Sequence, residues 1–151
     1  MNVLVGDIGG TKTALAIVSS EKGPRSLANE RHFLCAQYDS VDEIIHAYLS
    51  DAAVQIDAIC LVVAGPVIDG KAKITNLPWV MEEAHLAAKF NVARAKLLND
   101  LEGMAYAVPI LSEEDVFTLS PGCAVLSLKI RSPAQSLCHQ YRQLEHSLSI
   151  P

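Results

Sequence analysis

The sequence predicts an α/β fold with a mixed sheet, whose elements follow the order β-β-β-α-β-α-β-α. Two short apolar runs at 3–5 and 14–18 flank a glycine-rich turn, which is the pattern of a β-hairpin. Apolar residues then recur at helical spacing over 41–52. Nearly continuous apolar runs at 56–64 and 95–99 are typical of strands that are covered on both faces. Together these patterns predict an antiparallel meander extended by parallel strands with crossover helices.

The segments between these runs complete the predicted order. A third strand is expected over 31–36, and Ser40 and Glu43 form a capping box at the start of the first helix. Gly65-Pro66 turns the chain after the run at 56–64. Trp79 is expected in the core, the alternative being a platform on which a sugar stacks. The remaining expected elements are a short segment at 72–74, a loop at 75–79, a helix over 80–90 and a helix over 101–108 that Pro109 ends.

Composition narrows the classes of protein to consider. Half of the 151 residues are hydrophobic, which suits a single domain with a substantial core. The net charge of −5 argues against a nucleic-acid binder. The first residues carry no basic segment or long apolar run, so we expect no signal peptide, no membrane anchor and a cytoplasmic protein. The four cysteines lack metal-site spacing, and we expect them to be reduced and structural.

The turn of the opening hairpin is the first candidate site. Glycines lack a Cβ, so backbone N–H groups can converge there on a phosphate group. Asp7 would accept a magnesium ion through its waters, because that ion keeps most of its water shell. The Thr11 hydroxyl would donate to a phosphate oxygen, and Lys12 is either a phosphate contact or a solvated residue. The candidate phosphate residues are Gly6, Asp7, Ile8, Gly9, Gly10 and Thr11.

Two better-known phosphate motifs do not match this turn. A P-loop needs a glycine directly before its Lys-Ser/Thr pair and a helix after it, whereas Thr11 precedes Lys12 and a strand pattern follows. A dinucleotide fingerprint needs Gly-x-Gly-x-x-Gly, and Gly6, Gly9 and Gly10 do not have that spacing. A tight hairpin without a ligand is the remaining alternative from the glycines alone.

The order Gly6-Asp-Ile-Gly-Gly-Thr11 between two strands resembles the first phosphate motif of the sugar kinases related to hexokinase, actin and the Hsp70 ATPases. Within that superfamily it looks most like the bacterial glucokinases and the related ROK group. The resemblance implies a ribonuclease-H-like (actin-like ATPase) half-domain, with ATP and Mg²⁺ at the hairpin. The predicted order of elements agrees with that half-domain.

A second stretch, 97–107, resembles the glucokinase segment that holds a sugar ligand and the catalytic base. The resemblance makes Asn99 a sugar ligand and Asp100 the base. The segments 64–66 and 75–79 also look like glucokinase loops that line the sugar cleft, which makes Asn76 a sugar contact. On physical grounds a carboxylate at the end of a buried strand can accept a hydroxyl proton. The alternative is that Asn99 and Asp100 only cap the following helix.

The function that this resemblance implies is the ATP-dependent phosphorylation of the 6-hydroxyl of glucose, which feeds glycolysis. Glucose and ATP are then the small-molecule partners, with neither nucleic acid nor membrane. A kinase for another hexose such as mannose, or for an N-acetylated amino sugar, stays open. So does a non-catalytic sugar-sensing or interaction module built on the same lobe.

The resemblance stops near Pro121, where the composition also changes. All eight glycines lie at or before Gly122, and residues 127–151 are rich in serine and glutamine. We therefore expect an amino-terminal kinase lobe over 1–123 and a divergent, non-native tail over 124–151 of a truncated product. The alternative for the tail is a native helical extension over 134–148. A chain without a second lobe is expected to turn over little, and to self-associate through the face that this lobe would cover.

Overall fold

The computed structural model describes residues 1–74 and 76–115, which divide into two units, Met1–Asp100 and the residues from Leu101 onward. The expected tail at 124–151, its alternative helix at 134–148 and Thr75 lie outside the described residues. Among the described residues, no helix has the length and apolar character needed to cross a membrane.

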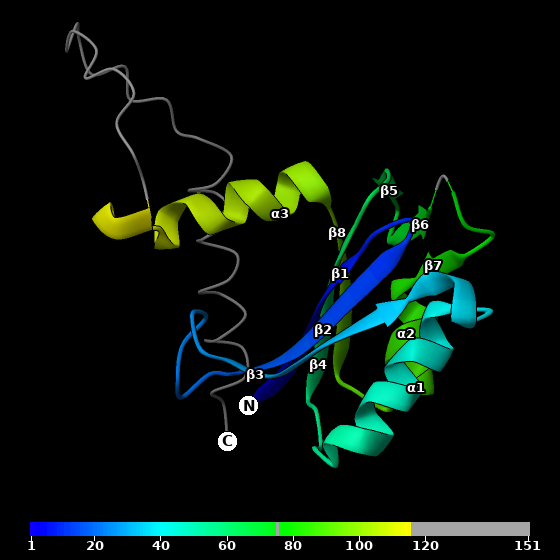
Figure 1. Cartoon of the computed structure of the whole chain (residues 1–151), viewed down its shortest axis with the longest axis horizontal. Coiled ribbons are helices and arrows are strands. Elements are labelled where there is room, and N and C mark those ends of the chain that lie inside the picture. Colours follow the sequence, from blue (N-terminus) through cyan, green and yellow to red (C-terminus); the bar gives the residue numbers. More distant parts are fainter. Residues whose placement is uncertain (75, 116–151) are drawn as a thin grey trace, which may run out of the picture. The chain divides into compact units, whose positions relative to one another are not determined.

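A five-stranded mixed sheet forms the centre of the first unit (Figure 1). The strands lie in the order β3-β2-β1-β4-β8, in which β1 is antiparallel to β2 and parallel to β4, and β4 is parallel to β8. Its strands are β1 (Asn2–Ile8), β2 (Lys12–Ser19), β3 (Leu27–Leu34), β4 (Ala58–Val63) and β8 (Arg94–Asn99). The structure is thus α/β with a mixed sheet, as the sequence predicts.

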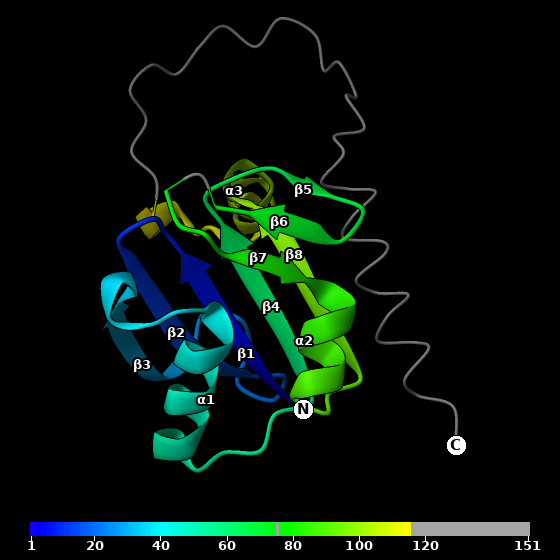
Figure 2. The same ribbon diagram turned by 90° about the vertical axis from the view of Figure 1, so that its right-hand side faces the viewer.

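Two helices, α1 (Val41–Ala52) and α2 (Glu83–Lys89), lie on one face of this sheet (Figure 2). The strand residues that face them form the core, and burying each such side chain stabilises the fold by about 1.5–3 kcal/mol. The largest fully buried side chains of the sheet and of the two helices include Leu4, Ile8, Leu15, Ile59, Leu61, Leu97, Ile44, Ile45, Tyr48 and Leu86. Trp79 is also buried, as expected.

The helix α1 begins as the sequence predicts. The Ser40 hydroxyl accepts a hydrogen bond from the Glu43 N–H at 3.3 Å. The Glu43 carboxylate in turn accepts from the Asp39 N–H at 2.9 Å, one residue earlier than in a standard capping box. Ala53 ends the helix in the left-handed region, with its N–H donating to the Leu49 carbonyl.

The observed order departs from the expected one between β4 and α2, where three short strands form a second sheet. These strands are β5 (Val67–Ile68), β6 (Lys71–Lys73) and β7 (Val80–Glu82), in that order across the sheet. In Figure 2 this second sheet lies beyond the carboxyl ends of β4 and β8. Ala72 of β6 and Met81 of β7 are buried and belong to the hydrophobic core of the first unit.

Two predicted boundaries were wrong. The helix expected over 80–90 covers only Glu83–Lys89, because residues 80–82 pair with β6 and Met81 is buried opposite Ala72. The third strand, expected over 31–36, runs from Leu27 to Leu34 and is followed by the 3-10 turn η1 (Cys35–Gln37). It starts earlier because the pairing with β2 continues past an irregularity at Asn29, whose φ is 54°.

The second unit, described by itself, contains short helical segments. α3 (Asp100–Ala107) starts at the last residue of the first unit, and it is followed by η2 (Val108–Ile110) and η3 (Glu113–Asp115). Its observed start is one residue before the expected Leu101, and Pro109 lies in η2 after the end of α3. Within the described part, α3 has no buried residue.

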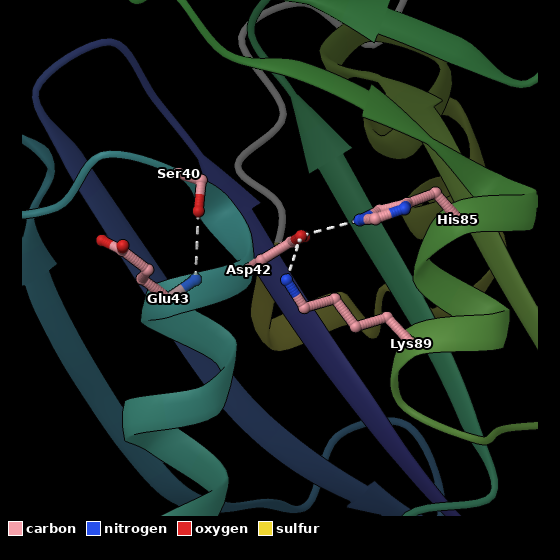
Figure 3. A network of polar contacts seen from close by, with 5 residues as sticks. All are labelled: Ser40, Asp42, Glu43, His85 and Lys89. Carbon is pink, nitrogen blue, oxygen red and sulfur yellow. Dashed lines mark hydrogen bonds and ion pairs between the residues drawn. The ribbon is translucent and has the colours of Figure 1, made fainter.

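Asp42 joins the two helices on the covered face (Figure 3). Its Oδ2 atom lies 2.7 Å from His85 Nε2 and accepts a hydrogen bond from Lys89 Nζ at 2.8 Å. The Asp42 side chain is 14% exposed, whereas both partners on α2 are about half exposed. Burial raises the pKa of Asp42, but the hydrogen bonds and charges of Lys89 and His85 outweigh burial, so its pKa lies below the ordinary value.

We expect Asp42→Asn to lower the free energy of unfolding at pH 7 by about 1 kcal/mol, since two partly exposed pairs are lost. Because the folded-state pKa is lowered, the contribution of Asp42 is present above the unfolded pKa of about 4 and is lost as the pH falls through the folded value. Urea unfolding at pH 7 and pH 3 measures this. Glu30→Gln, on the exposed strand β3, is the control. An equal deficit of Asp42→Asn at both pH values would contradict the assignment.

Candidate active site

The three parallel strands of the sheet end at one edge. Ile8 of β1 pairs with Val63 of β4, and Val63 pairs with Asn99 of β8, so the last residues of the three strands are in register. The residues that follow each strand therefore emerge side by side. These are the hairpin turn, the loop 64–66 and Asp100, which are the segments in which the sequence places the candidate site. Ligands of open α/β sheets collect at such carboxyl ends.

The hairpin turn is closed by a hydrogen bond from the Gly9 N–H to the Lys12 carbonyl at 3.0 Å. A Cβ on Gly9 would lie 2.9 Å from that same carbonyl oxygen, so the close approach of the two chains requires glycine here. The N–H groups of Gly10 and Thr11 have no hydrogen-bond partner within the part of the chain that the structure describes. Two amide donors of the turn thus remain for an anion.

Asn76 lies against this turn. A Cβ added to Gly10 would come within 3.3 Å of the Asn76 Cβ and 3.4 Å of its Nδ2. The structure therefore brings together two of the predicted elements, the phosphate turn and the exposed side chain assigned to the sugar. The sequence alone gives no measure of this distance, because 65 residues separate the two positions.

Gly6, Asp7 and Ile8, the three predicted phosphate residues that lie in β1, differ in whether a ligand can reach them. A Cβ on Gly6 would lie 2.5 Å from Leu15 Cδ2 and 2.8 Å from Leu61 Cδ2, so this glycine makes room for the core. The Ile8 side chain is fully buried, and the Ile8 carbonyl accepts from the Ala64 N–H at 3.1 Å. The Asp7 side chain is exposed. Of the three, only Asp7 has a polar side chain that a ligand can reach.

Asn99 and Asp100 occupy the junction of β8 and α3. The half-buried Asn99 donates from Nδ2 to the Gly65 carbonyl at 3.0 Å, which ties the end of β8 to the loop after β4. Gly65 is itself close to the second sheet, since a Cβ there would lie 2.8 Å from the Lys73 carbonyl. Asp100 is exposed and is the first residue of α3. Its carboxylate can therefore meet a substrate hydroxyl.

The sequence analysis assigned no role at the turn to two polar side chains beside it, since it did not single out Thr13 and expected Cys35 to be reduced and structural, and Cys35 is indeed a free, buried cysteine. Thr13 and Cys35 are buried and contact each other across β2 and the end of β3. The predicted antiparallel meander could have indicated this contact. Because Lys12 pairs with Leu34, the next residue, Cys35, lies opposite Thr11 at the turn. Among the described residues, no cluster of three or more His, Cys, Asp or Glu side chains could hold a metal ion.

Comparison with known proteins places the chain in a family. The family model described as glucokinase matches residues 4–130. The chain belongs to the glucokinase family. As a family member it is 30% identical over 113 residues to the glucokinase of Tolumonas auensis, covering 75% of this chain and 35% of that relative. It is 33% identical over 129 residues to the glucokinase of Chromohalobacter salexigens, covering 82% and 40%.

Solved structures carry the same fold. A glucokinase from an Antarctic psychrotroph superposes with a TM-score of 0.73 at 28% identity, covering 82% of this chain and 40% of that one. A ROK family glucokinase from Streptomyces griseus, solved with glucose and AMPPNP, matches with a TM-score of 0.50 at 19% identity, covering 71% and 35%. This glucokinase-family chain spans about a third to two fifths of the length of the relatives that it matches.

Proposed function

We propose that residues 1–123 form the amino-terminal lobe of an ATP-dependent hexose kinase, with a ribonuclease-H-like half-domain as its core. The reaction is transfer of the terminal phosphoryl group of ATP to the 6-hydroxyl of glucose. One observation carries the proposal: the register of Ile8, Val63 and Asn99 puts the hairpin turn and Asp100 at the same edge of the sheet. The family membership supports the reaction class.

In this proposal Asp100 is the general base. Its exposed carboxylate accepts the proton of the 6-hydroxyl as that oxygen attacks the terminal phosphorus, and ADP leaves with the electron pair of the broken P–O bond. Asn99 is held by the Gly65 carbonyl and so presents its amide in a fixed direction to a sugar hydroxyl. Asn76 is the second sugar contact, next to Gly10.

The turn binds the phosphates of ATP through backbone amides. The N–H groups of Gly10 and Thr11 face no other partner within the described residues, and the Thr11 hydroxyl is exposed. Phosphoryl transfer depends mainly on such positioning and on neutralising the phosphate oxygens. Gly6 and Ile8 contribute through packing and backbone only.

Magnesium fits this edge as an ion carried with ATP. Mg²⁺ is usually bound by one or two carboxylates together with substrate phosphates, and it keeps several waters. Asp7 offers one exposed carboxylate beside the turn, which is enough for an ion that is bound mainly by the phosphates of ATP. Among the described residues, no cluster of side chains would hold the ion without ATP. Mg²⁺ would supply charge neutralisation at the phosphates.

Glucose is the sugar that the family membership favours, and the Streptomyces griseus enzyme was solved with glucose and an ATP analogue. Kinases for other hexoses or for N-acetylated amino sugars remain the alternative within the same chemistry. The proposal includes a cytoplasmic location, which supplies ATP to such a kinase. A second lobe is the proposed partner, because closure over the substrates excludes water and completes the site.

A chimera tests the proposal. Residues 1–115 of this chain replace the matching segment of Tolumonas auensis glucokinase, and glucose 6-phosphate formation from ATP, Mg²⁺ and glucose is measured in a coupled assay. We expect turnover from the chimera and little from the isolated chain. A folded chimera that binds neither glucose nor ATP would contradict the proposal, and turnover with mannose or an N-acetylated amino sugar alone would favour the alternative.

A further inference from the structure

Two buried polar side chains that the proposed reaction leaves unused contact the turn from inside the protein. Thr13 is fully buried and Cys35 is 1% exposed. Thr13 Oγ1 lies 3.4 Å from Cys35 Sγ, and Cys35 Sγ lies 3.5 Å from the Gly9 carbonyl oxygen, to which it donates. The Cys35 N–H also donates to the Thr11 carbonyl at 3.0 Å. Cys35, the residue that follows β3, thus donates hydrogen bonds to two carbonyl groups of the turn.

These contacts fix the direction of the turn's amides. In a trans peptide unit the C=O and N–H bonds point in opposite directions, and the described residues contain no cis peptide bond. The Gly9 carbonyl points toward Cys35, so the N–H of Gly10 points away from it. In the same way, the Thr11 carbonyl points toward Cys35 and the N–H of Lys12 points away. Cys35 therefore turns the Gly10 amide donor away from the core, and it also fixes the peptide unit that joins Thr11 to Lys12.

The hydrogen-bond directions give Thr13 a part in this arrangement. A thiol has one hydrogen, and the Cys35 thiol donates it to the Gly9 carbonyl. The Thr13 hydroxyl is then the donor in its contact with Cys35 Sγ. The result is a short chain of hydrogen bonds from Thr13 through Cys35 to Gly9, and successive bonds in such a chain strengthen one another. Packing alone gives no reason for a hydroxyl here, because valine has the same shape.

We infer that Thr13 and Cys35 are positioning residues of the phosphate site, which hold the backbone of the turn so that the Gly10 N–H faces the bound anion. This inference rests on the proposed function of the hairpin turn. Neither side chain reaches the phosphate itself. They act through the backbone of Gly9 and Thr11, and the ligand class that they serve is a polyphosphate.

The test uses the complete chain and two readouts. The first is the amide NMR resonances and hydrogen exchange of Gly10 and Lys12 without ligand. The second is the affinity for inorganic pyrophosphate in the presence of Mg²⁺. The variants are Cys35→Ala and Thr13→Val, which each remove one donor, and Cys35→Ser, which restores a donor. Ile44→Val, in the buried face of α1, is a control that lowers stability away from the turn.

We expect Cys35→Ala and Thr13→Val to displace the Gly10 and Lys12 resonances and to weaken pyrophosphate binding roughly three- to tenfold, as the loss of one hydrogen bond implies. Cys35→Ser should stay close to the wild type, and Ile44→Val should lower the melting temperature without these changes. Unchanged Gly10 and Lys12 resonances in Cys35→Ala overturn the inference, whether or not pyrophosphate binds. Displaced resonances in a chain whose wild type binds no pyrophosphate support the positioning role and refute the phosphate function.

Discussion

Replacing Asp100 by asparagine in the active chimera is expected to lower kcat by about 10²- to 10⁴-fold, with little change in the KM for glucose. The amide has nearly the shape of the carboxylate and can still form a hydrogen bond to the sugar, but it cannot take up the proton of the 6-hydroxyl. Asp100 is exposed at the end of β8, so the substitution should cost the fold little. The coupled assay over a range of glucose concentrations separates kcat from KM.

Asp51→Asn is the matched control, because Asp51 is an exposed carboxylate near the end of α1 that pairs with Arg31. We expect its kcat to equal that of the unmodified chimera. If Asp100→Asn retained full kcat, Asn99 and Asp100 would only start the helix α3, and the base would lie elsewhere. A loss of kcat in both variants would point to a general effect on folding.

Gly9→Ala is expected to lower kcat/KM for ATP on the order of 10²-fold, because misplacement of a phosphate site by about 1 Å has effects of that size. The new Cβ would lie 2.9 Å from the Lys12 carbonyl oxygen, which is backbone and belongs to the bond that closes the turn. The turn must therefore change shape. Steady-state kinetics with ATP as the varied substrate measures the loss.

Gly23→Ala provides the glycine control for this prediction. Gly23 lies in the connection between β2 and β3 with φ at 80°, and nothing within 4 Å meets an added Cβ. Alanine is strained at that φ, so the variant should be less stable by about 1 kcal/mol and keep its kinetics. An unchanged kcat/KM in Gly9→Ala would mean that the phosphates do not bind at this turn.

Local sequence patterns correctly predicted the elements whose formation depends on residues close together in the sequence. The opening hairpin follows from two apolar runs around glycines, and the start of α1 follows from Ser40 and Glu43, which satisfy backbone N–H groups at this end of the helix. β4 and β8 follow from apolar runs, although burial is complete on only one face of β4, where fully buried residues alternate with half-buried ones. In each case the deciding residues lie within about one helical turn or one strand of one another.

The second sheet could not be predicted in the same way. Strands of two or three residues are too short to show a period, and residues 80–82 join smoothly onto the helical pattern of α2. Pairing with β6, the burial of Met81 and the ion pair between Lys71 and Glu82 decide that segment. These are tertiary contacts, which override weak local preference.

For the candidate site, the sequence predicted which residues take part, and the structure shows where they lie relative to one another. The chemistry of the glycine turn selected Asp7, and the family resemblance selected Asn99 and Asp100. Only the register of the parallel strands shows that the hairpin and Asp100 share an edge. Nothing local distinguishes Gly6, which makes room for Leu15 and Leu61, from the glycines of the turn. The contacts of Cys35 with the turn likewise depend on the pairing of β2 with β3.

The most direct test of the shared edge is a crystal structure of the chimera with glucose and a non-hydrolysable ATP analogue. We predict that the glucose 6-hydroxyl lies about 2.6–3.2 Å from the Asp100 carboxylate, with the Asn99 amide on a neighbouring hydroxyl and phosphate oxygens at the Gly10 and Thr11 N–H groups. Glucose bound away from Asp100, or phosphates bound away from the hairpin turn, would contradict the account.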